Sequence, residues 1–216
     1  MPEPELMLDA EQARAYAQAD FEAPHRRCIE LFQERFSDLP AHGRAADLGC
    51  GPGDVTLRLA RVLPAWHIDA FDGSPAMLVW AHEAAEGAGV HTVTFIEALL
   101  PHHQPPHAAY DLLFSNSLLH HLADASALWS LLPRWGRRGA GVYVMDLLRP
   151  DDETAADALV DQYAAGEPDV LRRDFANSLR AAYRPSEVQR QLVAAGLEQL
   201  AVEVVSDRHL LVWGQL

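Results

Sequence analysis

Apolar and polar positions alternate in blocks along the middle of the chain, and these blocks predict strands followed by helices. Short, continuously apolar runs lie at 45–49, 67–72, 91–97, 110–116 and 141–148. Apolar residues with the three-to-four-residue spacing of a helix lie between them, at 55–63, 76–89 and around 122–135. Apolar strands that alternate with helices are typical of a parallel sheet covered by helices on both faces.

The segments on either side of this alternation have other patterns. Residues 5–39 have helical periodicity interrupted by Pro24, and residues 151–192 are largely helical as well. Two β-rich runs near the end, separated by Ser206-Asp207, predict an antiparallel hairpin. We therefore expect four parts: a helical cap (1–43), an α/β core (44–150), a helical insert over the substrate site (151–192) and a hairpin that completes the sheet (193–216).

Composition excludes several classes of function. The 216 residues carry 17 basic and 31 acidic side chains, a formal net charge of −14, and all the basic residues are Arg. Without Lys, Schiff-base, pyridoxal and Walker-type P-loop chemistry are impossible, and so acidic a chain is a poor partner for nucleic acid. There is no signal-peptide pattern and no apolar stretch of about 18 residues. We expect a cytoplasmic protein with no membrane partner, in which Cys28 and Cys50 are reduced.

A glycine-rich turn after the first predicted strand carries the strongest chemical signal. The stretch Asp47-Leu48-Gly49-Cys50-Gly51-Pro52-Gly53-Asp54 lets the backbone turn tightly and approach a ligand. Asp72 ends the next predicted strand, where a carboxylate can accept hydrogen bonds from both ribose hydroxyls.

The spacing of this turn does not fit a dinucleotide, because position 54 would have to be glycine. The carboxylate of Asp54 would compete with a pyrophosphate for the positive end of the helix dipole, and no Arg lies between 45 and 57 to offset it. An adenosyl ligand without phosphate fits better, since Asp47 can attract its sulfonium and ammonium groups. The alternative is a tight turn that binds no ligand.

Five stretches resemble the motifs of class I S-adenosylmethionine-dependent methyltransferases: ADLGCGPGDVTLRLA, IDAFDGSPAML, FIEALLP, YDLLFSNSLLHHL and GVYVMDLLRP. The resemblance covers about residues 44–150. It implies S-adenosyl-L-methionine as cofactor and S-adenosyl-L-homocysteine as product. It also implies a Rossmann-like α/β fold, whose mostly parallel sheet has seven strands in the order 3-2-1-4-5-7-6 with an antiparallel C-terminal pair.

The same resemblance implies roles for individual residues. Asp47 faces the amino-acid end of the cofactor and Asp72 takes its ribose hydroxyls. The backbone cradle consists of Gly49, Cys50, Gly51 and Gly53, and the adenine is flanked by Gly73, Ser74 and Met77. Glu97 with Ala98 contacts the adenine amino group, and Ser115 with Asn116 lies beneath the reactive methyl. Independently of the resemblance, Ser74 is also expected to cap a helix that starts at Pro75.

Methyl transfer depends on proximity and alignment more than on acids and bases, because a sulfonium is already a good leaving group. Ser115-Asn116-Ser117 lacks the Asn/Asp-Pro-Pro-aromatic signature of methyltransferases that act on DNA and on protein amide nitrogens, which favours a small soluble substrate. We predict Asn116, Tyr16 and His120 as catalytic residues. His120 is alternatively a helix-start histidine that only satisfies backbone groups. The loop histidines His102, His103 and His107 are not expected to bind a metal.

Two polar and aromatic clusters in the flanking helical segments are predicted to contact the substrate. The members of the first cluster are Tyr16, Asp20, Phe21 and His25, and those of the second are Arg172, Arg173, Asp174, Phe175, Asn177, Ser178 and Tyr183. All of them except His25, Asp174 and Ser178 are predicted substrate contacts. Arg would bind a substrate carboxylate, and Asp or Asn its amine; Arg180 and Arg184 are further candidates, since Lys is absent. The alternative for Phe175 and Tyr183 is packing within the insert.

Nearly the whole chain also resembles one particular module, the methyltransferase module of ovothiol biosynthesis, which methylates an imidazole nitrogen of 4-mercaptohistidine. The stretches that carry this resemblance are YAQADFEAPHRRCIELFQERF, SNSLLHHL and RRDFANSLRAAYRPSEVQRQLVAAGL. It implies the same N-methylation here, with Tyr16 or Asn116 fixing the imidazole tautomer. Three alternatives stay open: O- or C-methylation of a quinone, phenol or polyketide-like metabolite, a cofactor-binding regulator without turnover, and a nucleotide-linked dehydrogenase. The sequence does not indicate an oligomeric state.

Overall fold

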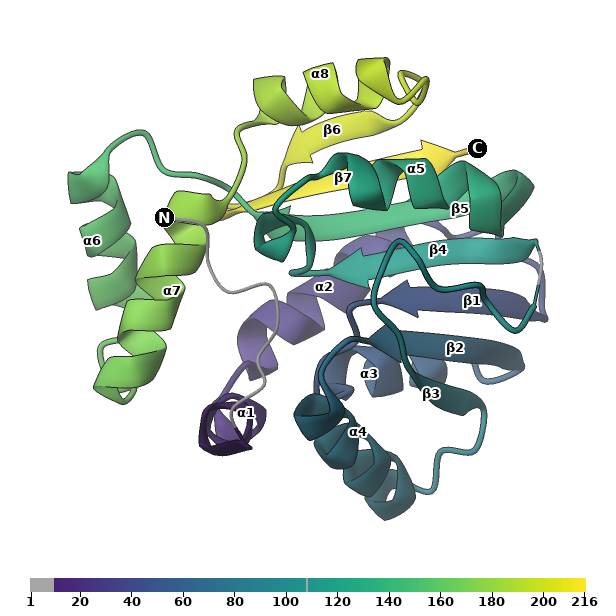
Figure 1. Ribbon diagram of the computed structural model, residues 1–216, viewed down its shortest axis with the longest axis horizontal. Coiled ribbons are helices and arrows are strands. Elements are labelled where there is room, and N and C mark those ends of the chain that lie inside the picture. The colour runs from purple at the N-terminus through teal and green to yellow at the C-terminus, as the bar shows by residue number, and fades with distance from the viewer. Residues whose placement is uncertain (1–9, 108) are drawn as a thin grey trace.

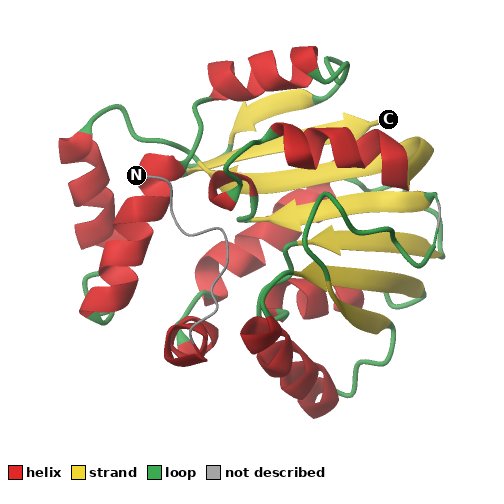
Figure 2. Ribbon diagram, viewed as in Figure 1, coloured by secondary structure: helices red, strands yellow, loops and turns green. Residues whose placement is uncertain are grey.

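The computed structural model describes residues 10–107 and 109–216, and its centre is a seven-stranded sheet between two layers of helices (Figures 1 and 2). The strands are β1 (Gly43–Leu48), β2 (Trp66–Asp72), β3 (Val93–Glu97), β4 (Tyr110–Asn116), β5 (Gly136–Leu147), β6 (Ala201–Val204) and β7 (His209–Gln215). Their order is β3-β2-β1-β4-β5-β7-β6. Strands β1 to β5 run parallel, and β7 is antiparallel to both of its neighbours. The predicted fold class and strand order are confirmed.

Both faces of the sheet are buried under helices. Helices α2 (Glu22–Arg35), α3 (Asp54–Val62) and α4 (Pro75–Ala88) cover one face, and α5 (Ser126–Trp135) and α8 (Pro185–Ala194) cover the other. Successive residues of a strand point to opposite faces, so Phe114 packs with α2 and α3 while Leu113 packs with α5. Burial on both faces explains why these strands are continuously apolar.

The start of α4 has the predicted cap. The Ser74 hydroxyl accepts a hydrogen bond from the N–H of Met77 at 3.2 Å, and Pro75 occupies the first turn, where its missing N–H costs nothing. This cap fixes the turn that directly follows β2.

Three helices lie outside the two layers, beyond the carboxyl ends of the parallel strands: α1 (Ala10–Gln18), α6 (Glu153–Tyr163) and α7 (Asp169–Ala181) (Figure 1). Helices α6 and α7 share a small apolar core that includes Leu159 and Leu179. The prediction that all of 151–192 lies over the site is wrong for α8, because Val188 and Leu192 are buried in the main core beside α5.

The N-terminal helices also differ in detail from the prediction. The break falls at 19–21, between α1 and α2, and Pro24 lies in the first turn of α2, where proline is tolerated. Residues 5–9 of the predicted helical segment lie outside the described residues. Cys28 and Cys50 are buried and unpaired. Within the described ranges, no helix is both long enough and apolar enough to cross a bilayer.

Candidate functional site

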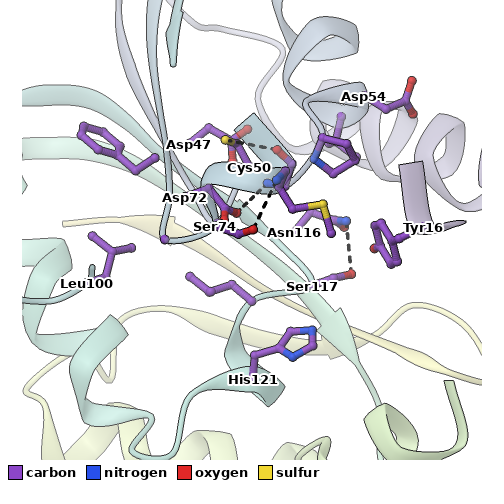
Figure 3. A pocket seen from close by; sticks show the side chains of 18 of the residues that line it. Tyr16, Asp47, Cys50, Asp54, Asp72, Ser74, Leu100, Asn116, Ser117 and His121 are labelled. Carbon is purple, nitrogen blue, oxygen red and sulfur yellow. Dashed lines mark hydrogen bonds between the residues drawn. The ribbon is translucent and has the colours of Figure 1, made fainter. Parts of the chain in front are cut away.

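A cavity of about 430 Å³ lies at the carboxyl ends of β1, β2 and β4, next to α1 and α7 (Figure 3). Its walls come from the turns after β1 and β2, the segment after β3, the end of β4, the 3-10 turn η1 (Leu119–His121), α1 and α7. The carboxyl edge of a parallel sheet gathers residues from distant parts of a chain. The volume is typical of a small-molecule site, for which about 300–1,000 Å³ is usual.

The glycine-rich turn after β1 has a backbone conformation that other residues rarely adopt. Gly49, Gly51 and Gly53 have φ angles of +76°, +53° and +83°. The N–H of Gly49 donates to the carbonyl of Phe71 at 2.8 Å, which ties the turn to β2. A Cβ on Gly49 would lie 2.8 Å from Cδ1 of Leu118, another cavity residue. Glycine is therefore required where the backbone approaches the cavity.

Asp72 joins two of the turns that form the cavity wall. Its Oδ2 accepts a hydrogen bond from the N–H of Gly51 at 2.8 Å, and its Oδ1 accepts one from the N–H of Ser74 at 2.8 Å (Figure 3). Burial raises the pKa of the Asp72 carboxyl, and the two backbone hydrogen bonds oppose that rise. Each carboxylate oxygen has a second lone pair, so Asp72 can accept two further hydrogen bonds from a ligand.

Asp47 lines the cavity with a buried carboxyl that accepts a hydrogen bond from Oγ1 of Thr56 at 2.5 Å. Burial raises the pKa of Asp47 to about 7, because the charged form is poorly solvated. A cationic group in the cavity would stabilise the ionised carboxylate, and a phosphate would repel it. The sequence analysis missed Thr56, which holds the carboxyl in place.

Most of the predicted cofactor residues line the cavity: Asp47, Gly49, Cys50, Gly51, Asp72, Gly73, Ser74, Met77 and Ala98. The thiol of Cys50 is protonated, because burial and two nearby carboxylates raise its pKa well above the usual range. Cys50 therefore contributes backbone and volume to the cradle and is no nucleophile.

Gly53, Glu97 and Ser115 were predicted to contact the cofactor and lie outside the cavity. A Cβ on Gly53 would be 3.1 Å from Cβ of Ala81, so this glycine permits close packing of α4. Glu97 is exposed at the end of β3, and Leu99 and Leu100 follow it into the cavity wall. The hydroxyl of Ser115 donates to the carbonyl of Leu48 at 2.8 Å and so joins β4 to β1.

Another group of polar side chains, on the side of the cavity away from Leu100, consists of Tyr16, Asn116, Ser117 and His121 (Figure 3). Nδ2 of Asn116 donates to Oγ of Ser117 at 3.2 Å. Ser117 has a φ angle of 59°, which is uncommon for a residue other than glycine. Backbone strain of this kind persists where the surroundings impose it, and here it turns the chain at the end of β4.

His121, rather than the predicted His120, faces the cavity. The ring of His120 is buried, with Nδ1 at 2.7 Å from Oδ1 of Asp146. His121 lies against it at a centroid distance of 4.1 Å. Burial and the adjacent His120 lower the pKa of His121 to about 3, so its imidazole is neutral at physiological pH. His120 does not line the cavity, because its ring is turned toward Asp146.

Helices α1 and α7 meet over the cavity. Nε2 of Gln12 on α1 donates to Oδ2 of Asp174 on α7 at 2.9 Å, and both residues line the cavity. Tyr16, one helical turn after Gln12, lines it from α1, and Arg173 and Asn177 line it from α7. The structure thus brings the predicted Tyr16, Asn116, Arg173 and Asn177 together with Asp174 of the second cluster, and adds Gln12.

The other predicted substrate contacts lie outside the cavity lining: Asp20, Phe21, Arg172, Phe175 and Tyr183. Asp20 accepts a hydrogen bond from the N–H of Glu22 at 3.0 Å, and Phe21 packs against the rings of Tyr16 and His25. Both residues therefore contribute to the start of α2, and neither lines the cavity.

The residues of this group in the insert face away from the cavity because of helical periodicity. Arg172 donates to Asp161 at 2.8 Å, on the α6 side of α7, and Phe175 packs against the core of the α6–α7 pair. Tyr183 packs against the main core. Arg180 and Arg184 are also engaged elsewhere, the first with Glu153 and the second with backbone carbonyls. Packing within the insert, the alternative for both aromatic residues, describes Phe175, whereas Tyr183 packs against the main core instead.

A third cavity feature is the contact between His25 and Asp54, two residues that the sequence analysis named but did not connect. Nδ1 of His25 lies 2.6 Å from Oδ2 of Asp54, and Nε of Arg58 donates to the same oxygen at 2.8 Å. Burial opposes ionisation of Asp54, but these two partners lower its pKa to about 2. The expectation that no cation offsets Asp54 is wrong, because Arg58 lies one helical turn further along α3. His25 comes from another helix, so no local spacing indicates it.

Comparison with known proteins identifies the core of the chain. Residues 45–139 match the sequence family described as "Methyltransferase domain". A trans-aconitate 2-methyltransferase of Methylobacterium nodulans is 34% identical over 135 residues, which are 62% of this chain and 49% of that protein. The Escherichia coli K12 protein of the same name is 42% identical over 79 residues, 37% of this chain and 29% of that protein. The matches thus span half or less of these curated relatives.

Solved structures show the same fold over nearly the full length. A SAM-dependent methyltransferase from Aquifex aeolicus superimposes with a TM-score of 0.70 at 17% identity, covering 97% of this chain and 99% of that one. The plantazolicin methyltransferase BpumL, in complex with a triazolic desmethylPZN analog and SAH, gives 0.72 at 13% identity, with coverages of 95% and 90%.

Proposed function

We propose that this chain, whose core is a class I S-adenosylmethionine-dependent methyltransferase domain, transfers a methyl group from S-adenosyl-L-methionine to a small polar molecule. Asp72 carries this proposal. Its two oxygens are each held at 2.8 Å by the backbone of a different turn, and its remaining lone pairs are available to two hydroxyls of one ribose.

The remaining cavity residues fit the same cofactor. When bound, S-adenosyl-L-methionine supplies a methyl group on a sulfonium. Asp47 would hold its ammonium group, and Met77, Ala98 and Leu100 offer an apolar surface for the adenine. Arg173, on α7, is the single arginine among the described residues that line the cavity. A pyrophosphate at the glycine-rich turn would therefore meet Asp47 and no guanidinium from the lining.

The acceptor would lie between Tyr16, Asn116 and His121. The phenol and the amide can donate hydrogen bonds that orient a nucleophile. His121 can do the same, but a group with a pKa of about 3 is a weak base near neutral pH. This arrangement favours a nucleophile that carries a free lone pair and does not have to lose a proton before it attacks.

The acceptor that we propose is an imidazole nitrogen of 4-mercaptohistidine, as in the ovothiol pathway that the sequence resembles. A neutral imidazole attacks through a lone pair once its tautomer is fixed, and Tyr16 and Asn116 are placed to fix it. The reaction would take place in the cytoplasm, since a reducing compartment suits the free Cys28 and Cys50. A small-molecule partner, and not a nucleic acid, suits the net charge of −14.

Three alternatives make different demands on the cavity. The name of the curated relatives suggests methylation of trans-aconitate, whose carboxylates would meet Asp54 and Asp174. A quinone or phenol would want apolar walls where Gln12 and Asn177 lie. A regulator without turnover would bind the cofactor and release no product.

Two measurements test the proposal. Calorimetry should show binding of S-adenosylhomocysteine and little binding of NAD⁺. Asp72→Ala and Asp72→Asn should weaken that binding by about tenfold or more, because each lost hydrogen bond to a charged group is worth about 1.5–3 kcal/mol. Asp157→Asn, which makes the same charge change at an exposed position of α6, is the control. Tighter binding of NAD⁺ would refute the proposed cofactor.

The second measurement identifies the acceptor. Labelled cofactor is incubated with 4-mercaptohistidine, trans-aconitate, a phenol or a metabolite extract, and mass spectrometry locates the added methyl. Methylation of 4-mercaptohistidine is the expected result, and preferential methylation of another compound would replace it. Binding of S-adenosylhomocysteine without turnover of any acceptor would favour the regulator.

A further inference from the structure

The acceptor end of the cavity has little positive charge. Of the described residues that line it, Arg173 alone has a guanidinium, and its side chain is 68% exposed. Two lining carboxylates lie near Tyr16: Asp174 is bound by Gln12, one helical turn before Tyr16, and Asp54 contacts His25, whose ring packs on Phe21 beside Tyr16. A ligand with several carboxylates would be repelled by both and attracted by one solvated cation.

The two carboxylates are not equivalent. Asp54 contacts two basic side chains, His25 at 2.6 Å and Arg58 at 2.8 Å, and the same guanidinium of Arg58 also donates to Glu22 at 2.6 Å. Asp174 accepts a hydrogen bond from the neutral amide of Gln12 at 2.9 Å and a longer one, at 3.3 Å, from the exposed Arg173. An exposed pair of this kind is weakened by solvent and salt. Asp174 therefore has fewer and weaker basic partners than Asp54.

Asp174 is also held in place. Its side chain is 18% exposed. It lies on the same face of α7 as Asn177, three residues further on. Leu171 and Leu179 are buried on α7 and fix that helix. Gln12 fixes the carboxylate from the opposite helix. An acid that is positioned from both sides and lines a cavity differs from a solvated surface charge.

Resting on the proposed function, we infer that Asp174 binds a protonated amine of the methyl acceptor, with Gln12 orienting the carboxylate and Asn177 beside it. Arg173 can form an ion pair with one carboxylate of the same acceptor molecule. The acceptor class is then an amine or a zwitterion, and a polycarboxylate does not fit.

The test uses the 216-residue chain saturated with S-adenosylhomocysteine and four probes in calorimetry: histamine, L-histidine, 3-(imidazol-4-yl)propanoate and trans-aconitate. The first three share an imidazole and differ in amine and carboxylate. Both amines should bind at least tenfold more tightly than the propanoate. Asp174→Asn should remove the preference for the amines. Asp161→Asn, which makes the same charge change at an exposed position of α6, should keep that preference.

Several results would overturn the inference: tighter binding of trans-aconitate than of either amine, no binding of the amines to the S-adenosylhomocysteine complex, or an unchanged preference in Asp174→Asn. These outcomes leave the proposed cofactor intact. Failure to bind S-adenosylhomocysteine itself would instead refute the proposed function and the acceptor assignment with it.

Discussion

Three aspartates of one small cavity differ in charge because their partners differ. Asp47 is held by the neutral hydroxyl of Thr56, and burial raises its pKa to about 7. Asp54 has His25 and Arg58 as partners, and its pKa is lowered to about 2 despite partial burial. Asp72 receives backbone hydrogen bonds that oppose the effect of burial. Residue type alone therefore does not give the charge of an acid in this site.

Asp47 makes cofactor binding depend on pH. Its carboxyl is neutral below about pH 7 and ionised above it, and the ammonium of the ligand prefers the ionised form. The affinity for S-adenosylhomocysteine should rise with pH through about 7 and level off above it, changing at most about tenfold per pH unit below that value. Calorimetry between about pH 5.5 and 8.5 measures this dependence.

Asp47→Asn is the matching variant, since it keeps the shape and removes the titration. It should bind more weakly than the wild type at high pH, with a flat profile over the same range. A profile in Asp47→Asn that still follows that of the wild type would assign the titration to another group.

Substitutions of His120 and His121 should have different effects, the first mainly on stability and the second mainly on activity. His120→Ala leaves the buried Asp146 without one of its partners and should lower the free energy of unfolding by about 2 kcal/mol. His121→Ala should lower kcat/KM by about tenfold or more, because an orienting group is lost. Its stability should change less than that of His120→Ala, and His121→Asn should recover part of the activity. Chemical denaturation and steady-state rates measure the two effects, and His67→Ala, at an exposed imidazole, is the control.

The reverse pattern would contradict the structure. If His120→Ala folds with wild-type stability and loses activity, while His121→Ala remains fully active, then His120 is the residue that faces the substrate.

At the scale of the elements, the glycine-rich turn and the 3-10 turn η1 form a single unit. Gly49 has a φ angle of +76°, and a Cβ there would lie 2.8 Å from Leu118, the residue just before η1. Asp72 connects the turn after β2 to this unit, because its carboxylate accepts a hydrogen bond from the N–H of Gly51. A change in one turn therefore moves the walls that the other two contribute.

Gly49→Ala should weaken the binding of S-adenosylhomocysteine by at least about tenfold, because both the positive φ angle and the contact with Leu118 are disturbed. Gly89→Ala is a matched control: Gly89 also has a positive φ angle, of +64°, but an added Cβ would meet no atom within 4 Å. It should cost about 1 kcal/mol of stability and leave the affinity unchanged. Equal affinities for the two variants would show that the turn is not part of the site.

At the scale of the whole molecule, the α6–α7 pair is fastened to the far edge of the sheet. Tyr163, at the end of α6, donates a hydrogen bond to Asp207 at 2.6 Å in the turn between β6 and β7. The guanidinium of Arg208 lies over the Tyr163 ring, 3.3 Å from its centroid. The C-terminal hairpin therefore helps to hold α7, and with it Asp174, over the cavity.

Tyr163→Ala should loosen this attachment. Cation–π contacts at exposed sites are worth about 0.5–1 kcal/mol, so we expect a small loss of stability and faster amide exchange across 153–181. KM for the acceptor should rise about two- to fivefold, while the affinity for S-adenosylhomocysteine stays the same. Tyr163→Phe keeps the ring, and its amide exchange and KM should lie between those of the wild type and those of Tyr163→Ala. Unchanged exchange in Tyr163→Ala would mean that the hairpin does not hold the insert.

The sequence determined the sheet, its order through the family resemblance, and the cradle of Asp47, Gly49, Gly51 and Asp72. Burial on both faces leaves a continuously apolar strand, and a tight turn leaves glycines at a fixed spacing, so these features are written locally in the chain.

Only the tertiary structure decided which side chains meet at the acceptor end. The pairs of Gln12 with Asp174 and of His25 with Asp54 join residues 162 and 29 positions apart, so no spacing along the chain records them. His121 lines the cavity in place of the predicted His120, and Arg172 and Phe175 point away from it. Both results follow from how η1 and α7 rotate as they pack. Rotation of a helix about its axis is set by the core that it buries, and that core is formed by the whole fold.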